Sequence, residues 1–137
     1  MSIKVNVERE VSIASAFTQL IAAWDVSPYS WYRKVHYTRA GLAAIQADKE
    51  PRKTDVLAVV TVWCENGETT GRTKQVKITG RWIARTLVWC LNTSAEGLHT
   101  ALAGKSAMQI IDERPSVDRN TADVVFQIGA YGKVVFG

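Results

Sequence analysis

Residues 55–64 constrain the fold more than any other segment, because their apolar side chains occupy both alternating sets of positions. The apolar members are Val56, Leu57, Val59, Val60, Val62 and Trp63. A strand that is apolar on both faces belongs in the middle of a sheet rather than at its edge. A glycine-punctuated turn follows, and in residues 72–79 Val76 and Ile78 share one face. We therefore predict a hairpin whose first strand is central in its sheet.

Helical periodicity is clearest in two segments. In residues 12–24 the large apolar side chains recur on one side of a helical wheel, and Ser12 is placed to cap the first turn. Residues 81–91 show the same periodicity. A third helix is predicted over residues 93–104, because this segment opens on the spacing of a capping box and ends at a glycine.

The other segments predict shorter elements. Strands are predicted at 3–7, 31–38, 108–111, 123–128 and 133–136, a turn at 129–132, one or two helical turns at 41–47 and an exposed loop at 48–54. Together these elements predict a single domain over residues 1–137. Its class is α+β, a mostly antiparallel sheet with two or three amphipathic helices packed on it.

Charge is segregated along the chain. Residues 69–95 contain no Asp or Glu, and their bases are Arg72, Lys74, Lys77, Arg81 and Arg85. Residues 31–53 hold six bases against two acids, while the rest of the chain is net acidic. The formal net charge is +4. A small basic protein with two basic zones has a preferred face for anions or acidic partners.

The sequence shows no arrangement typical of catalysis or metal binding. His36 and His99 are isolated, Cys64 and Cys90 have no close partner, and no glycine-rich phosphate loop is present. We therefore predict no metal, no cofactor and no enzymatic activity. The two cysteines are expected to be buried thiols in a reducing compartment.

No apolar run approaches the roughly 20 residues that a membrane helix needs. Residues 1–8 alternate polar and apolar side chains and lack the apolar stretch of a signal peptide. We expect no membrane partner, and a location in the cytoplasm or in an assembled particle.

The predicted helix at 81–91 combines bases with aromatic side chains. On a helical wheel, Trp82 and Trp89 lie beside Arg81 and Arg85. Arg and Trp together are typical of nucleic-acid sites, where phosphate pairing combines with base stacking. They are equally typical of protein interface hot spots. In the third interpretation, both rings pack in the core and the arginine stems cover them.

The predicted strand at 31–38 has a similar composition. Simple alternation places Tyr32, Lys34 and His36 on one face and Arg33 on the other. Aromatic and basic side chains on a sheet are typical of single-strand RNA readers, although cross-strand packing also explains aromatic residues there. The candidate interaction residues are Arg33, Lys34, Arg72, Lys74, Lys77, Arg81, Trp82, Arg85 and Trp89.

Three functional hypotheses follow. The first is a non-enzymatic assembly or protein-interaction subunit, a homo-oligomeric component of a larger particle such as a virion or phage structure. It is favoured by abundant tryptophan and by hairpins that offer edge strands for pairing between copies. The second is a nucleic-acid-binding protein that uses the basic zones 31–53 and 72–85. The third is a small inhibitor or immunity-type protein.

Overall fold

The computed structural model describes residues 2–6, 9–24, 32–47, 49–92, 98–112 and 119–136 of the chain. Its strands are β1 (Ser2–Asn6), β2 (Arg9–Ser12), β3 (Tyr32–Tyr37), β4 (Val56–Trp63) and β5 (Thr73–Thr79). β1 pairs with β2, and the other three strands form an antiparallel sheet in the order β3-β4-β5. The apolar strand β4 is therefore central, as predicted.

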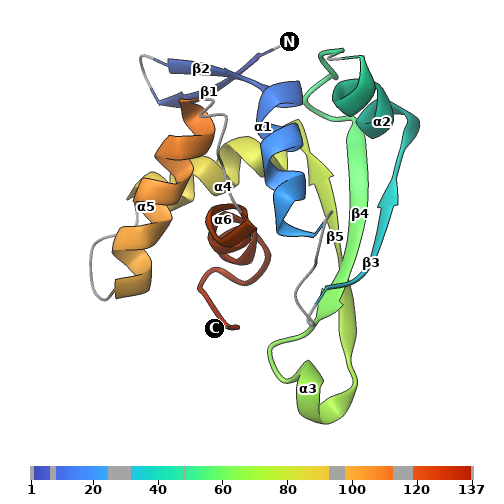
Figure 1. Cartoon of the computed structure of the whole chain (residues 1–137), viewed down its shortest axis with the longest axis vertical. Helices are drawn as coiled ribbons and strands as arrows, with labels where there is room; N and C mark the ends of the chain where they lie inside the picture. Colours follow the sequence, from blue (N-terminus) through green and yellow to red (C-terminus); the bar gives the residue numbers. More distant parts are fainter. Residues whose placement is uncertain are drawn as a thin grey trace.

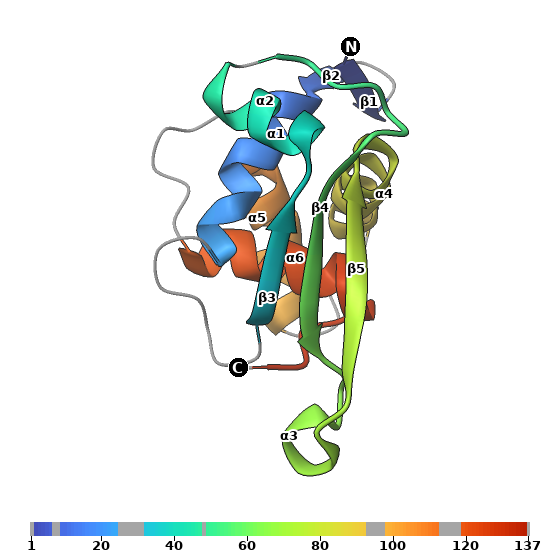
Figure 2. The same cartoon turned by 90° about the vertical axis from the view of Figure 1, so that its right-hand side faces the viewer.

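Helices make up most of the remaining described structure. They are α1 (Ile13–Leu20), extended by the 3-10 turn η1 (Ile21–Ala23), α2 (Arg39–Gln46), α3 (Gly67–Thr70), α4 (Gly80–Asn92), α5 (Leu98–Ile111) and α6 (Arg119–Tyr131). α1, α4 and α6 lie on the same side of the sheet, and no described element covers its other side (Figure 1 and Figure 2). The predicted α+β class is confirmed.

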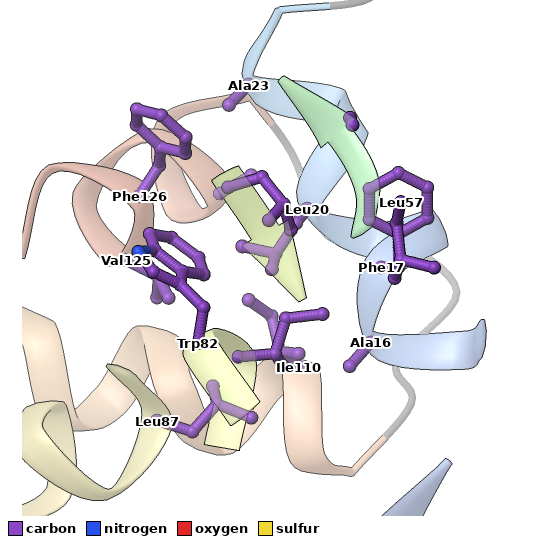
Figure 3. Close-up of a cluster of buried hydrophobic side chains, with 14 of the residues drawn as sticks. Ala16, Phe17, Leu20, Ala23, Leu57, Trp82, Leu87, Ile110, Val125 and Phe126 are labelled. Carbon is purple, nitrogen blue, oxygen red and sulfur yellow. The ribbon is translucent and has the colours of Figure 1, made fainter. Parts of the chain in front are cut away.

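Aromatic rings at the centre of the core join the sheet to the helices. The ring of Phe126 on α6 lies 5.4 Å from that of Trp24 and 5.6 Å from that of Trp82. Tyr32 of β3 lies 5.3 Å from the same ring. Figure 3 shows Trp82 and Phe126 in this cluster, with Leu20 of α1 nearby. Because aromatic side chains bury large apolar areas, this cluster holds α4, α6 and β3 together.

The predictions for the first two thirds of the chain are largely confirmed. The strands at 3–7 and 31–38, the helices at 12–24 and 81–91 and the turns at 41–47 all form over their described residues. The predicted cap on the first helix also forms, since Oγ of the residue before α1 accepts the third helical N–H at 3.2 Å. The capping box predicted at 93–96 lies outside the described residues.

The strands predicted at 108–111 and 123–128 are wrong, because these residues belong to α5 and α6. In α6, the buried residues Ala122, Val125 and Phe126 have helical spacing and face the rest of the core. The β-branched residues in this segment favour a strand locally. Packing of a helix against α4, α5 and η1 outweighs that weak preference.

The turn predicted at 129–132 is also wrong, since Gly129 lies inside α6. A Cβ atom on Gly129 would lie 2.4 Å from Cζ2 of Trp82, so glycine allows α6 to approach α4 closely. Gly132 follows the helix with a φ of 77°, the left-handed conformation that commonly ends helices.

The strand predicted at 133–136 is a tail that is neither helix nor strand. Its backbone is held by Gln127, whose Oε1 accepts the N–H groups of Val135 at 2.8 Å and Phe136 at 2.9 Å. Nε2 of Gln127 donates to a carboxyl oxygen of Asp123 at 2.8 Å. The tail thus gains its hydrogen bonds from a buried side chain of α6 instead of from a neighbouring strand.

Candidate functional site

Strand register assigns alternate residues to the two faces of the sheet. Val60 of β4 is paired with Val35 of β3 and Val76 of β5, and this set faces the helices. Thr61, the next residue of β4, is paired with Lys34 and Gln75. Its set points to the uncovered side. Successive side chains of a strand alternate between faces, so the same division holds wherever the pairing is regular.

We call the uncovered side the outer face. Its members are Arg33, Lys34, His36, Val59, Thr61, Trp63, Thr73, Gln75 and Lys77. In Figure 2 this face is turned toward the viewer, with α4 and α6 behind it. None of the three strands contains Asp or Glu. The outer face is therefore a basic and polar surface with no carboxylate of its own.

The register also brings the two basic zones together. Lys34 of β3 and Lys77 of β5 lie on opposite sides of β4 on the same face, and both side chains are exposed. Neighbouring strands are about 4.8 Å apart, so the two lysine-bearing strands are separated by roughly 10 Å. Two segments that are distant in the sequence thus form one cationic surface.

A β-bulge changes which residues of β3 reach the outer face. Pairing shifts between Tyr32 and Lys34, so Tyr32 points inward, contrary to the alternation expected from the sequence. Arg33 is the extra residue, and its guanidinium lies 4.8 Å from the ring centroid of Trp63. The bulge therefore places a cation over an aromatic ring at one end of the outer face.

Trp63 is held against the turn that joins β4 to β5. A Cβ atom on Gly67 would lie 2.8 Å from both Cβ and Cε3 of Trp63, so glycine is needed where α3 packs on this ring. The carbonyl of Trp63 accepts the hydroxyl of Tyr131 from α6. Burial, together with nearby negative charges, raises the pKa of that tyrosine. Trp63 is thus fixed from both sides of the sheet.

Lys74 is a predicted site residue that the structure places elsewhere. It belongs to the inner set of β5 with Val76, and its Nζ donates to the carbonyl of Ala130 near the end of α6. The same ammonium lies 4.4 Å from the ring centroid of Tyr131. A cation at a helix C-terminus is favoured by the helix dipole. We therefore assign Lys74 to stabilising α6, not to the outer face.

The candidate residues on α4 also lie away from the outer face. Trp82 is only 6% exposed and belongs to the core, so it is not available to a partner. Arg81 and Arg85 are exposed and Trp89 is 45% exposed. All belong to α4, which lies on the helical side of the sheet (Figure 2). The sequence of bases at 72–85 is therefore not one continuous surface.

Arg72 is exposed and lies just before β5, at the hairpin end of the sheet. Sequence reasoning missed Thr61, Trp63 and Gln75 as members of the candidate site. Alternation along β5 places Gln75 with Lys77, but pairing with β4 and β3 depends on the hairpin register. The bulge in β3 has no sequence signature, so this part of the site became visible only in the structure.

Two ionisable side chains, Cys90 and Asp123, are buried among the described residues. Burial raises the pKa of the Cys90 thiol to about 12, which leaves it a poor nucleophile at neutral pH. Cys64 is half-buried. Asp123 accepts the hydroxyl of Tyr32 at 3.1 Å and the amide of Gln127. Burial raises its pKa to about 6, against the effect of those two hydrogen bonds.

Within the described ranges, no group of three or more His, Cys, Asp or Glu side chains could hold a metal ion. The helices of the described part are too short or too polar to span a bilayer. Comparison of the chain with protein-family models, curated proteins and solved structures finds no significant match.

Proposed function

We propose that this protein binds single-stranded nucleic acid on the outer face of the β3-β4-β5 sheet. The observation that carries the proposal is the convergence of Lys34, Lys77 and Arg33 on one uncovered face whose strands contain no acid. Phosphate neutralisation by such residues supplies most of the affinity in non-specific binding.

The shape of the outer face favours a single strand over a duplex. The face is three strands wide, with Lys34 and Lys77 on its two outer strands. Thr61 lies on β4 between these two strands, and Gln75 is paired with it from β5; their polar groups suit hydrogen bonding to sugars or base edges. Open sheets bind extended RNA strands in this manner. A strand lying across the face would bring its phosphates near both lysines.

From the composition of the outer face, we expect the protein to discriminate little between nucleotide sequences. The aromatic ring in the outer set is Trp63, which is half-buried beneath Arg33. Many proteins that bind single strands contact the bases by stacking them on several exposed aromatic rings. We therefore propose a contact dominated by phosphates, with affinity that falls steeply as salt is added.

Assembly of identical copies, the first hypothesis from the sequence, has less support. Within the described part of the chain, the large apolar side chains that are exposed are Leu42 on α2 and Trp89 on α4. Stable interfaces need a contiguous, well-packed core of such side chains. Lysines on β5 and the bulge in β3 also hinder edge-to-edge pairing of sheets.

Salt-titrated binding tests the proposal. A short labelled single-stranded RNA or DNA is titrated with the protein, followed by fluorescence anisotropy at several salt concentrations. The Lys34→Ala/Lys77→Ala variant should bind more weakly and lower the salt slope by about 1.4, because each phosphate contact on a single strand contributes about 0.7.

The matched control is Arg85→Ala/Lys105→Ala, which removes two exposed positive charges from α4 and α5. It should keep the wild-type slope. If both variants lost the same affinity and salt slope, net charge alone would govern binding. That result would overturn the assignment to the outer face. Absence of binding by the wild-type protein would overturn the function itself.

A further inference from the structure

A surface cavity of about 480 Å³ lies between α2 and the segment that leads into β4. It is lined by Arg39, Ala40, Ala43, Lys49, Glu50, Pro51, Arg52 and Asp55. The volume is in the range of small-molecule sites. Three of the lining side chains are cationic and two are carboxylates, so the charge balance depends on what the carboxylates contact.

The Glu50 carboxylate faces the start of α1. Its Oε1 accepts the hydroxyl of Ser12 and the N–H of Ala14, both at 2.9 Å, and its Oε2 accepts the N–H of Ile13 at 2.9 Å. Partial burial acts to raise its pKa, but these hydrogen bonds outweigh it and lower the pKa below 4.5. The Glu50 carboxylate is thus hydrogen-bonded to the N-terminus of α1, where the helix dipole favours a negative charge.

The second carboxylate is engaged within its own loop. Oδ2 of Asp55 accepts the backbone N–H of Arg52 at 3.0 Å. This contact uses the backbone of Arg52 and leaves its guanidinium out of the pair. Neither carboxylate therefore neutralises the cationic side chains of the cavity through a direct ion pair in the described structure.

The cationic side chains of the cavity are outside any ion pair of the described structure. Arg39, Lys49 and Arg52 are exposed, and within the described ranges no carboxylate forms an ion pair with any of them. Arg39 and Ala40 are also the first residues of α2, where the helix dipole is positive. An anion in the cavity would interact favourably with all of these charges at once.

We propose that this cavity binds a phosphate group. Arginines that line a site bind phosphate bidentately, and the lysine adds a point charge. Small apolar side chains form the remaining wall, and the lining contains no aromatic ring on which a base could stack. The group recognised is therefore the phosphate itself, carried either by a free polyphosphate or by the terminus of a nucleic-acid strand.

The second of these sources rests on the proposed function. Arg39 lies two residues after the last residue of β3, and Asp55 lies directly before β4. The cavity is therefore at the end of the sheet where these two strands meet α2 (Figure 1). A strand bound on the outer face would reach the cavity with its terminal phosphate.

Calorimetric titration with pyrophosphate tests the cavity without any nucleic acid. The Arg39→Ala/Arg52→Ala variant should bind pyrophosphate at least about tenfold more weakly, because each arginine makes charge-assisted hydrogen bonds. The control Arg72→Ala/Arg85→Ala removes two exposed arginines outside the cavity and should retain wild-type affinity. Equal losses in both variants would overturn the proposal.

Oligonucleotides with and without a terminal phosphate separate the two sources. A phosphate-dependent gain of about tenfold that disappears in Arg39→Ala/Arg52→Ala would assign the strand terminus as ligand. Pyrophosphate binding without such a gain would assign a free anion. Pyrophosphate binding with no oligonucleotide binding would overturn the proposed function and leave the cavity assigned. Failure of both ligands to bind the wild-type cavity would overturn this inference.

Discussion

The inner face of the sheet is mainly apolar and the outer face is mainly polar and basic, although the two are built from alternate residues of the same strands. Ile78 and Val60 are fully buried under the helices, whereas Lys77 is exposed one position away from Ile78. The inner residues hold the fold together by removing apolar surface from water. The outer residues contribute little to folding, so they are available to determine binding.

The contrast is sharpest for Ile78 and Lys77, which adjoin each other on β5. Ile78→Ala should lower the free energy of unfolding by about 2–5 kcal/mol, because it leaves a cavity in a packed core. Lys77→Ala should change it by no more than about 0.5 kcal/mol. Urea unfolding of both variants measures the difference. Similar losses for the two would contradict the division into faces.

Asp123 is a buried carboxylate on the helical side of the sheet, where it accepts the hydroxyl of Tyr32 from the inner face. Its pKa of about 6 in the folded protein exceeds the ordinary aspartate value of 3.8, because burial disfavours the charged form. The folded state thus binds more protons between these values. Its contribution makes the free energy of unfolding fall as pH rises from about 4 to about 6, by about 3 kcal/mol in total.

Asp123→Asn should remove this pH dependence while leaving that of the other groups. The relevant quantity is the difference between wild type and variant across the pH series, not their absolute stabilities, since the amide also changes the hydrogen bonds to Gln127. A difference that stays constant from pH 4 to pH 7 would show that Asp123 is not buried as described.

Glu50 provides a titration of the opposite sign. Its pKa is lowered in the folded protein by hydrogen bonds from the start of α1, despite partial burial. The stabilisation is present above the unfolded pKa and is lost as pH falls through the folded value. Glu50→Gln should therefore cost about 1 kcal/mol at pH 7, as loss of a helix cap does. The two proteins should converge in thermal unfolding at low pH.

The smallest effect is expected at the cation–aromatic contact on the outer face. Arg33→Ala should lower the free energy of unfolding by about 0.5–1 kcal/mol, because it removes a guanidinium from the face of Trp63. Lys34→Ala, one residue away, should leave stability unchanged. Denaturant unfolding of both variants checks the pair. A larger loss of stability for Lys34→Ala would contradict the assignment of the cation–aromatic contact to Arg33.

The sequence predicted the fold best where local and long-range preferences agree. The helix at 12–24 has both a cap and a clear periodicity, and the hairpin of β4 and β5 has both turn residues and an apolar run. In α6 the local preference and the long-range contacts favour different structures. Val124 and Val125 favour a strand locally, while the contacts that make the segment helical come from α4, α5 and η1. Such contacts are not visible in a single sequence.

The candidate site was predictable only in part. Lys34 and Lys77 stand out as members of basic segments, but their meeting on one face depends on pairing through β4. Lys74 has the same charge and lies only three residues from Lys77. Because it occupies the alternate set of positions on β5, its side chain lies on the inner face and contacts α6. The alternation of side chains along each strand and the bulge in β3 determine which cations share the outer face. Local charge density in the sequence does not determine it.

Chemical-shift mapping would show which face of the protein a nucleic acid contacts. The isotope-labelled protein is titrated with a short single-stranded RNA, and shifts are followed for every assigned backbone amide. The account predicts the largest changes along β3, β4 and β5, at Lys34, Thr61 and Lys77, with little change around Arg85 on α4. Changes concentrated on α4, with the strands unaffected, would contradict it.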